Sequence, residues 1–110
     1  MKIPEKIKIG GHWYKITYPY HFRERGDLTG FHDGDAEAIL VDDRDNFSHE
    51  KRPESSVMVT LIHEVLHAID FVTGHHVFND NENAIEGFSQ CVYQILIDNG
   101  YLKNEQVPQR

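Results

Sequence analysis

The stretch PESSVMVTLIHEVLHAIDFVTG, residues 53–74, carries the clearest structural signal in the chain. Its apolar residues recur at intervals of three and four, which predicts one long amphipathic helix. The residues with this spacing are Met58, Ile62, Val65, Leu66, Ile69 and Val72. Pro53 and Glu54 suit the first turn of a helix, and Gly74 suits the position just past its end. Further apolar side chains widen the stripe, so we expect this helix to be buried on most sides.

The centre of this predicted helix reads His63-Glu64-Val65-Leu66-His67, an HExxH pattern. Residues four apart lie on the same helix face, so both imidazoles can reach one metal ion. Glu64 follows His63 directly, which places its carboxylate beside the metal, where it suits a base acting on metal-bound water. Burying two histidines and a glutamate without partners is unfavourable, and a metal would supply those partners. We therefore favour a metal site over a purely structural role in which the histidines are satisfied within the core.

A second helix is predicted from about Asp80 to Asn99, because apolar residues again recur at helical spacing. These residues are Ile85, Phe88, Val92, Ile95 and Leu96. Asn79 or Asp80 can cap the start of this helix, and Gly100 can end it.

The second helix offers a third ligand, which a catalytic zinc site usually needs beside an open position for water. The candidates are Glu82 and Glu86. We favour Glu86 because it lies next to the apolar stripe, whereas Glu82 lies in the first turn and can be explained as a helix-terminus charge. Cys91 lies on the same helix, but a lone thiol there is more simply explained as part of the core. The predicted site for one Zn²⁺ per chain comprises the metal ligands His63, His67 and Glu86 and the catalytic base Glu64.

The motif HEVLH, followed after eighteen residues by a glutamate within IEGF, resembles the gluzincin metallopeptidases, in which a glutamate on a following helix completes HExxH. IEGF is particularly similar to the glutamate-containing motif of the aminopeptidase branch. The size of the chain and the run LIHEVLHAID…YQILIDNG also resemble the short zincin-like proteins of phages and prophages. The resemblance covers residues 61–100 and implies the same ligands and the same catalytic Glu64. It also implies that the strand from Glu37 to Val41 pairs with an extended peptide substrate.

Three further residues are candidates for supporting this site. In thermolysin-like relatives an acidic residue four places after the glutamate ligand supports a histidine ligand, and Gln90 occupies that place here. Its amide can still hydrogen-bond an imidazole, with less charge support. Asp70 could support His67 or could be a solvated helix residue, and Tyr93 could point towards the site, although core packing explains Tyr93 better. The histidines without a metal-ligand spacing are assigned no role: His12, His21, His32 and His49.

The first 52 residues are predicted to form mainly strands and loops. KIKI at 6–9 and HWYKITY at 12–18 alternate around Gly10-Gly11, which predicts a hairpin. LTGF at 28–31 predicts a short strand, and EAILVDD at 37–43 predicts a clearer one. Residues 42–53 are charged and poor in apolar side chains, so we expect a loop there, and residues 101–110 are predicted to be a polar tail.

The composition, with 39% hydrophobic and 11% aromatic residues, fits one globular domain over residues 1–110. A formal net charge of −7 argues against nucleic-acid binding, which needs an excess of Lys and Arg. The start, MKIPEKIKIGG, lacks the apolar core of a signal peptide, and no apolar run reaches membrane-spanning length. A single cysteine, Cys91, excludes an internal disulfide. We therefore expect a cytoplasmic protein that binds no membrane, while the oligomeric state stays open.

Together these patterns predict an α+β protein with a minimal zincin-like fold. A small N-terminal antiparallel or mixed sheet would precede an active-site helix and a second, ligand-bearing helix. The predicted function is zinc-dependent hydrolysis of a peptide or protein substrate, with metal-activated water as nucleophile and a glutamate as general base. The alternative is a non-catalytic, zinc-containing binding or regulatory module of a phage or mobile element.

Overall fold

The computed structural model describes residues 3–78 and 81–102. Four strands precede two helices along the chain: β1 (Lys6–Ile9), β2 (His12–Thr17), β3 (Gly30–Asp33), β4 (Ala38–Val41), α1 (Glu54–Thr73) and α2 (Glu82–Asp98). The predicted α+β class, with an N-terminal sheet followed by two helices, is therefore confirmed. Most of the predicted polar tail, from residue 103 onward, lies outside the described residues.

The strands form one mixed sheet in the order β1-β2-β4-β3. β1 and β2 make the predicted antiparallel hairpin, in which Gly10 and Gly11 have φ values of 57° and 89° that favour glycine. β4 is paired on both sides, in parallel with β2 and antiparallel with β3. β3 is therefore an edge strand, and it starts at Gly30 rather than at the predicted Leu28.

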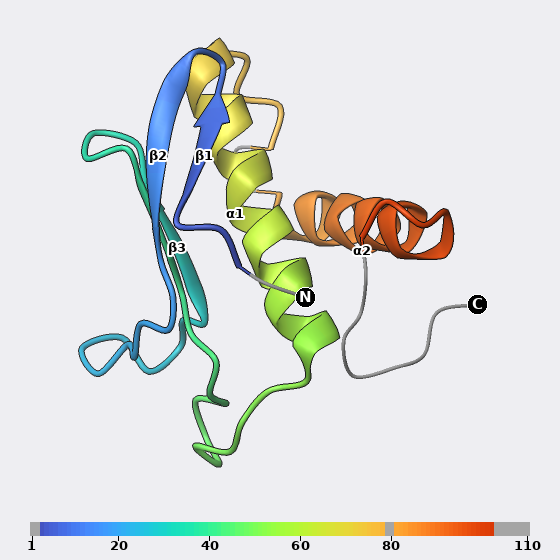
Figure 1. Cartoon of the computed structure of the whole chain (residues 1–110). Helices are drawn as coiled ribbons and strands as arrows, with labels where there is room; N and C mark the ends of the chain where they lie inside the picture. The colour runs from blue at the N-terminus through green and yellow to red at the C-terminus, as the bar shows by residue number, and fades with distance from the viewer. Residues whose placement is uncertain (1–2, 79–80, 103–110) are drawn as a thin grey trace.

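α1 covers one face of the sheet, and the core lies between them (Figure 1). Alternating strand residues face the helix, as the pleat requires; they are Ile9, Tyr14, Ile16, Ile39 and Val41. From α1 the core receives Val57, Met58, Leu61 and Ala68. The bounds of α1 agree with the predicted helix, and Gly74 ends it with a left-handed φ of 73°. Ile69 and Phe71 are exposed, so α1 is less buried than its composition predicts.

α2 lies on the other side of α1 from the sheet, with its N-terminal half nearest to α1 (Figure 1). Its N-cap is Asn81, whose side chain accepts a hydrogen bond of 3.1 Å from the N–H of Ala84. The predicted caps Asn79 and Asp80 lie outside the described residues. The buried residues of α2 are Ile85 and Ser89, whereas Phe88 and Ile95 of the predicted stripe are exposed.

By length and composition alone, α1 is the one helix in residues 3–78 and 81–102 that could cross a membrane. The core helix of a soluble protein has the same properties, and α1 supplies core residues to the sheet. The arrangement is therefore consistent with a soluble globular protein.

Candidate metal centre

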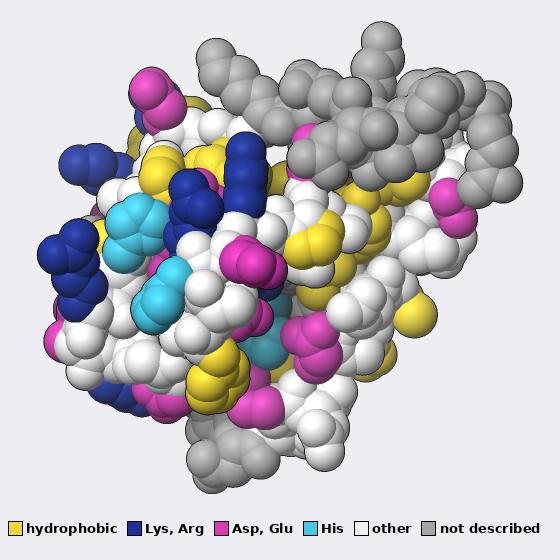
Figure 2. Space-filling view, turned by 90° about the horizontal axis from the view of Figure 1, so that it is seen from below, with side chains coloured by type: hydrophobic (Ala, Val, Ile, Leu, Met, Phe, Trp, Pro, Cys, Tyr) yellow, Lys and Arg dark blue, Asp and Glu magenta, His cyan; other side chains and the backbone are white. Residues whose placement is uncertain are grey.

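A cavity of about 530 Å³ lies between the edge of the sheet and the two helices. One wall is residues 27–32, which lead into β3, and the other comes from α1 and the first turns of α2. Figure 2 shows histidine side chains deep in a hollow, with Asp and Glu side chains around it. Because β4 is paired on both sides, the prediction that the strand from Glu37 to Val41 pairs with substrate is wrong. The strand that borders the cavity is β3.

The helical spacing of HExxH sets two imidazoles side by side on α1. The ring centroids of His63 and His67 are 5.0 Å apart, as expected for residues one turn apart on one face. Both side chains are mostly buried and line the cavity. α1 by itself therefore places two candidate nitrogen ligands on the face that borders the cavity.

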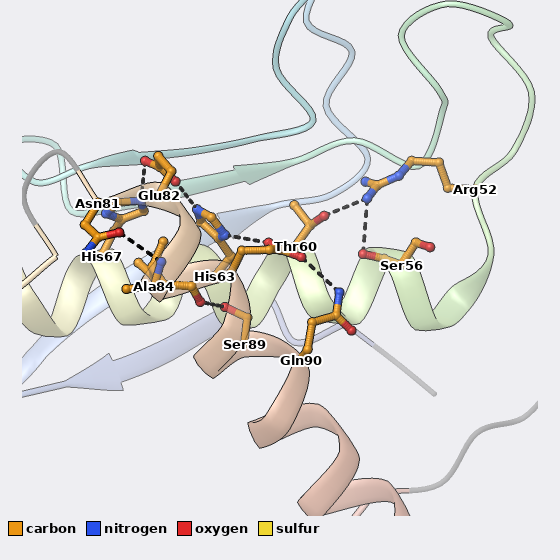
Figure 3. Close-up of polar contacts among 12 residues, drawn as sticks. Arg52, Ser56, Thr60, His63, His67, Asn81, Glu82, Ala84, Ser89 and Gln90 are labelled. Carbon is orange, nitrogen blue, oxygen red and sulfur yellow. Dashed lines mark hydrogen bonds and ion pairs between the residues drawn. The ribbon is translucent and has the colours of Figure 1, made fainter.

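The first turn of α2 brings Glu82 onto this pair (Figure 3). One carboxylate oxygen, Oε2, lies 2.8 Å from Nε2 of His63, and Oε1 lies 3.2 Å from Nε2 of His67. One ligand atom from each of the three residues lies within 4.8 Å of the others. Two imidazole nitrogens and one carboxylate oxygen at such separations could hold a metal ion.

Glu86, the third ligand predicted from the sequence, lies at the opposite nitrogen of His63. Its Oε1 is 3.0 Å from Nδ1 of that ring, and its Oε2 accepts a hydrogen bond of 2.9 Å from Gln90. Gln90 thus holds Glu86 rather than bonding an imidazole directly. The geometry favours Glu82 over the predicted Glu86, because Glu82 lies within 3.2 Å of the Nε2 atoms of both histidines. The N-terminal end of α2 lies nearest to α1, and the apolar stripe of α2 alone does not reveal this.

Glu64 is buried beneath the edge strand β3, with 8% of its surface exposed. Its carboxylate forms no hydrogen bond with any residue in the described part of the chain. Burial raises the pKa of Glu64 to about 7, while His63 acts to lower it and Glu82 to raise it further. A carboxyl group with such a pKa can both accept and release a proton near neutral pH.

Burial favours the neutral form of two imidazoles at the cavity, those of His67 and His32. Burial lowers the pKa of His67, against the opposing effect of the Glu82 carboxylate. Burial also lowers the pKa of His32, and the nearby His67 lowers it further. Neutral imidazole is the form that binds a metal, so this environment favours His67 as a ligand.

Asp70 and Tyr93, the remaining candidates from the sequence, have structural roles. The two carboxylate oxygens of Asp70 accept hydrogen bonds of 2.9 Å from the N–H groups of Val77 and Phe78. Although burial opposes the charged form, these bonds hold the pKa of Asp70 below its usual range. Asp70 therefore fixes the connection between the helices and does not hydrogen-bond His67. Tyr93 packs against the core, as the sequence favours.

Sequence reasoning missed two residues of the site, His32 and Gly30, which both lie on β3. His32 lines the cavity, and Gly30 lies against Glu64. The predicted strand ends at Phe31, which leaves His32 outside it. The observed strand, Gly30–Asp33, instead includes His32, and alternation turns it towards α1. Extending the predicted strand by two residues, to Asp33, would have placed His32 on the strand that lines the site.

A second group of ligand atoms within 4.8 Å comprises His21, Asp42 and Asp43. Asp42 already accepts hydrogen bonds from His21 Nδ1 at 2.8 Å and from the N–H of Arg44 at 3.1 Å. These contacts explain its position without a metal, and we assign the group no role.

No protein-family model, curated protein or solved structure matches this chain. A function for this chain therefore has to be inferred from the chemistry and geometry of the site.

Proposed function

We propose that this chain is a zinc-dependent metallopeptidase that hydrolyses peptide bonds in a peptide or protein substrate. The observation that carries the proposal is the convergence of His63, His67 and Glu82 within 4.8 Å at a cavity that the buried Glu64 also lines. Two histidines and one carboxylate are a ligand set of catalytic zinc sites, which leave a further position open. The net charge of −7 favours this substrate class over nucleic acid.

In this proposal Glu82 is the third ligand and Glu86 orients the ring of His63. Carboxylates commonly hold metal-ligating histidines through the ring nitrogen that faces away from the metal, and Glu86 lies 3.0 Å from that nitrogen. One feature of thermolysin-like proteins supports this assignment, whereas the likeness of IEGF to the aminopeptidase motif points to Glu86 as the ligand. An acidic residue is expected four places after the glutamate ligand, and Glu86 occupies that place once Glu82 is the ligand.

A bound zinc ion would supply a Lewis acid and an activated water at neutral pH. Glu64 would accept the proton of that water and pass it to the departing amine. Burial raises the pKa of Glu64 to about 7 in the metal-free protein, which strengthens this carboxylate as a base. Residues 27–32 would bind the substrate, because the edge of β3 can accept backbone hydrogen bonds from an extended peptide. The proposed setting, from the resemblance and the single cysteine, is the cytoplasm of a phage-infected or prophage-bearing cell.

Zinc binding tests the ligand assignment. We would measure zinc content and affinity for the wild type and for Glu82→Ala, Glu86→Ala and Glu64→Gln, with Asp98→Ala as a carboxylate control at the far end of α2. We expect about one zinc per chain in the wild type, in Glu64→Gln and in the control. Glu82→Ala should lose most binding, and Glu86→Ala should weaken it by about 10- to 100-fold. A wild type that binds no zinc would sink the proposal, and a larger loss in Glu86→Ala would restore the ligand set predicted from the sequence.

Hydrolysis of fluorescently labelled casein tests the reaction. Zinc-loaded wild type should cleave the probe, and zinc-loaded Glu64→Gln should not, although it keeps its metal. The non-catalytic binding module makes a different prediction, since both proteins would then bind zinc and neither would cleave. Cleavage that persists in Glu64→Gln would contradict the assignment of Glu64 as the base.

A further inference from the structure

His32 occupies a defined place in the wall of the cavity. It lies on β3, the edge strand, and lines the same cavity as His63, Glu64 and His67. Its ring stacks on Tyr14 with centroids 5.5 Å apart and meets the edge of Phe71 at 5.5 Å. The imidazole is therefore held between a strand residue and a helix residue.

The hydrogen bond behind His32 determines which ring nitrogen carries the proton. Nε2 lies 3.0 Å from the hydroxyl of Tyr14, a side chain with 1% of its surface exposed. That hydroxyl has no other hydrogen-bond partner among the described residues. A buried O–H that donates to nothing is unfavourable, so the hydroxyl donates to Nε2 and Nε2 carries no proton. In the neutral ring the proton then resides on Nδ1.

Nδ1 has no hydrogen-bond partner in the described part of the chain. Nor does His32 belong to the group whose ligand atoms lie within 4.8 Å of one another, so metal binding does not account for it. A neutral N–H donor is thus left in the wall of a cavity whose other described polar side chains are two threonines, two histidines and four carboxyl groups. No Lys or Arg among the residues that the structure describes lines the cavity and could donate instead.

We propose that His32 is a further catalytic residue, which donates a hydrogen bond from Nδ1 to the carbonyl oxygen of the bound peptide. Tyr14 is its positioning residue, because the Tyr14 hydroxyl selects the tautomer. This inference rests on the proposed peptidase function. Negative charge develops on that oxygen as the carbonyl is attacked, so a donor fixed in advance lowers the barrier without needing to move.

Spectra of the metal-free protein test the tautomer independently of any activity. Long-range ¹H–¹⁵N correlation of the histidine rings should show His32 protonated at Nδ1 and unprotonated at Nε2. In Tyr14→Phe the preference for this tautomer should weaken. A wild-type ring protonated at Nε2 would overturn the donor role, whatever the enzyme assays show.

Kinetics on zinc-loaded protein test the contact with substrate, again with labelled casein as the probe. His32→Phe keeps a stacked ring but no donor, and His32→Gln keeps a donor. We expect kcat to fall by about 10²- to 10³-fold in His32→Phe, with zinc affinity unchanged, and to be partly restored in His32→Gln. His12→Ala, which removes an exposed histidine outside the cavity, is the control and should behave as wild type.

The two proposals fail in different ways. If the wild type cleaves casein and His32→Phe cleaves it equally fast, His32 only supports the wall and the inference is wrong, while the peptidase function stands. If the zinc-loaded wild type cleaves nothing, the peptidase function fails and the catalytic role of His32 fails with it.

Discussion

Gly30 of the edge strand lies directly against the side chain of Glu64 on the helix below. A Cβ atom at residue 30 would stand 2.9 Å from Oε2 of Glu64 and 3.1 Å from its Cγ. The same atom would lie 2.6 Å from Cγ2 of Thr60. The absence of a side chain at this position therefore lets β3 close over the proposed catalytic base.

Gly30→Ala should displace Glu64 or push β3 away from α1. We expect it to destabilise the protein by about 1–3 kcal/mol, as overpacking of a tight contact does, and to reduce peptidase activity more than zinc affinity. Denaturant unfolding and zinc titration measure the two effects. Gly26→Ala is the matched control, because a Cβ there meets nothing within 4 Å. Equal behaviour of the two variants would show that the strand tolerates a side chain at residue 30.

The pKa of Glu64 predicts how the stability of the metal-free protein depends on pH. Burial raises this pKa from 4.5 to about 7 in the folded protein. Between these values the folded state keeps a proton that the unfolded state has lost, so the free energy of unfolding decreases as pH rises. Below about pH 4.5, Glu64 is protonated in both the folded and the unfolded state, so it does not lower the free energy of unfolding. Above about pH 7 the loss of stability is complete, on the order of 3 kcal/mol.

Glu64→Gln replaces the ionisable carboxyl group with a neutral amide, so the loss of stability at high pH no longer occurs. The variant should be more stable than the wild type at about pH 8, and the difference should shrink towards about pH 4.5. Denaturant unfolding of both proteins, each treated with a chelator, measures it at several pH values. Because the neighbouring histidines are the same in both proteins, the difference between the two free energies of unfolding chiefly reports the carboxyl group. A difference that does not change with pH would show that Glu64 has an ordinary pKa.

Asp70→Ala should loosen the connection that carries α2 to the metal centre. The N–H groups of Val77 and Phe78 lose their acceptors, so we expect the melting temperature to fall by roughly 5 °C. Because the pKa of Asp70 is below its usual range, its stabilising effect is present near neutral pH. That effect disappears as acid protonates the folded carboxylate. The melting temperatures of the two proteins should therefore converge at low pH. A difference in melting temperature that stays the same at every pH would contradict this role.

Gly87→Ala should stabilise α2 by about 1 kcal/mol, because glycine is unfavourable within a helix. A Cβ at residue 87 meets nothing within 4 Å, so the added methyl group has room. Gly74→Ala also has room but lies at a φ of 73°, where a side chain is strained, and it should destabilise the protein. Denaturant unfolding compares the two substitutions, and a destabilised Gly87→Ala would contradict the packing of α2.

The sequence by itself determined the features that depend on neighbours along the chain. The period of apolar residues and the terminal Gly74 set the bounds of α1, and the spacing of His63 and His67 put both imidazoles on one helix face. Gly10 and Gly11 likewise marked the hairpin turn between β1 and β2. Each of these features follows from interactions within a few residues, which a linear pattern records directly.

Only the tertiary structure decided which residues from distant segments join that pair. The position of α2 relative to α1 selects Glu82 rather than Glu86 for the two Nε2 atoms. The strand order makes β3, and not β4, the edge beside the cavity, and so brings His32 and Gly30 to the site. Glu82 and Glu86 are both polar, and they lie one turn apart on the same helix. Their local positions favour Glu86, which lies next to the apolar stripe, and only the packing of one helix on the other brings Glu82 to both histidines.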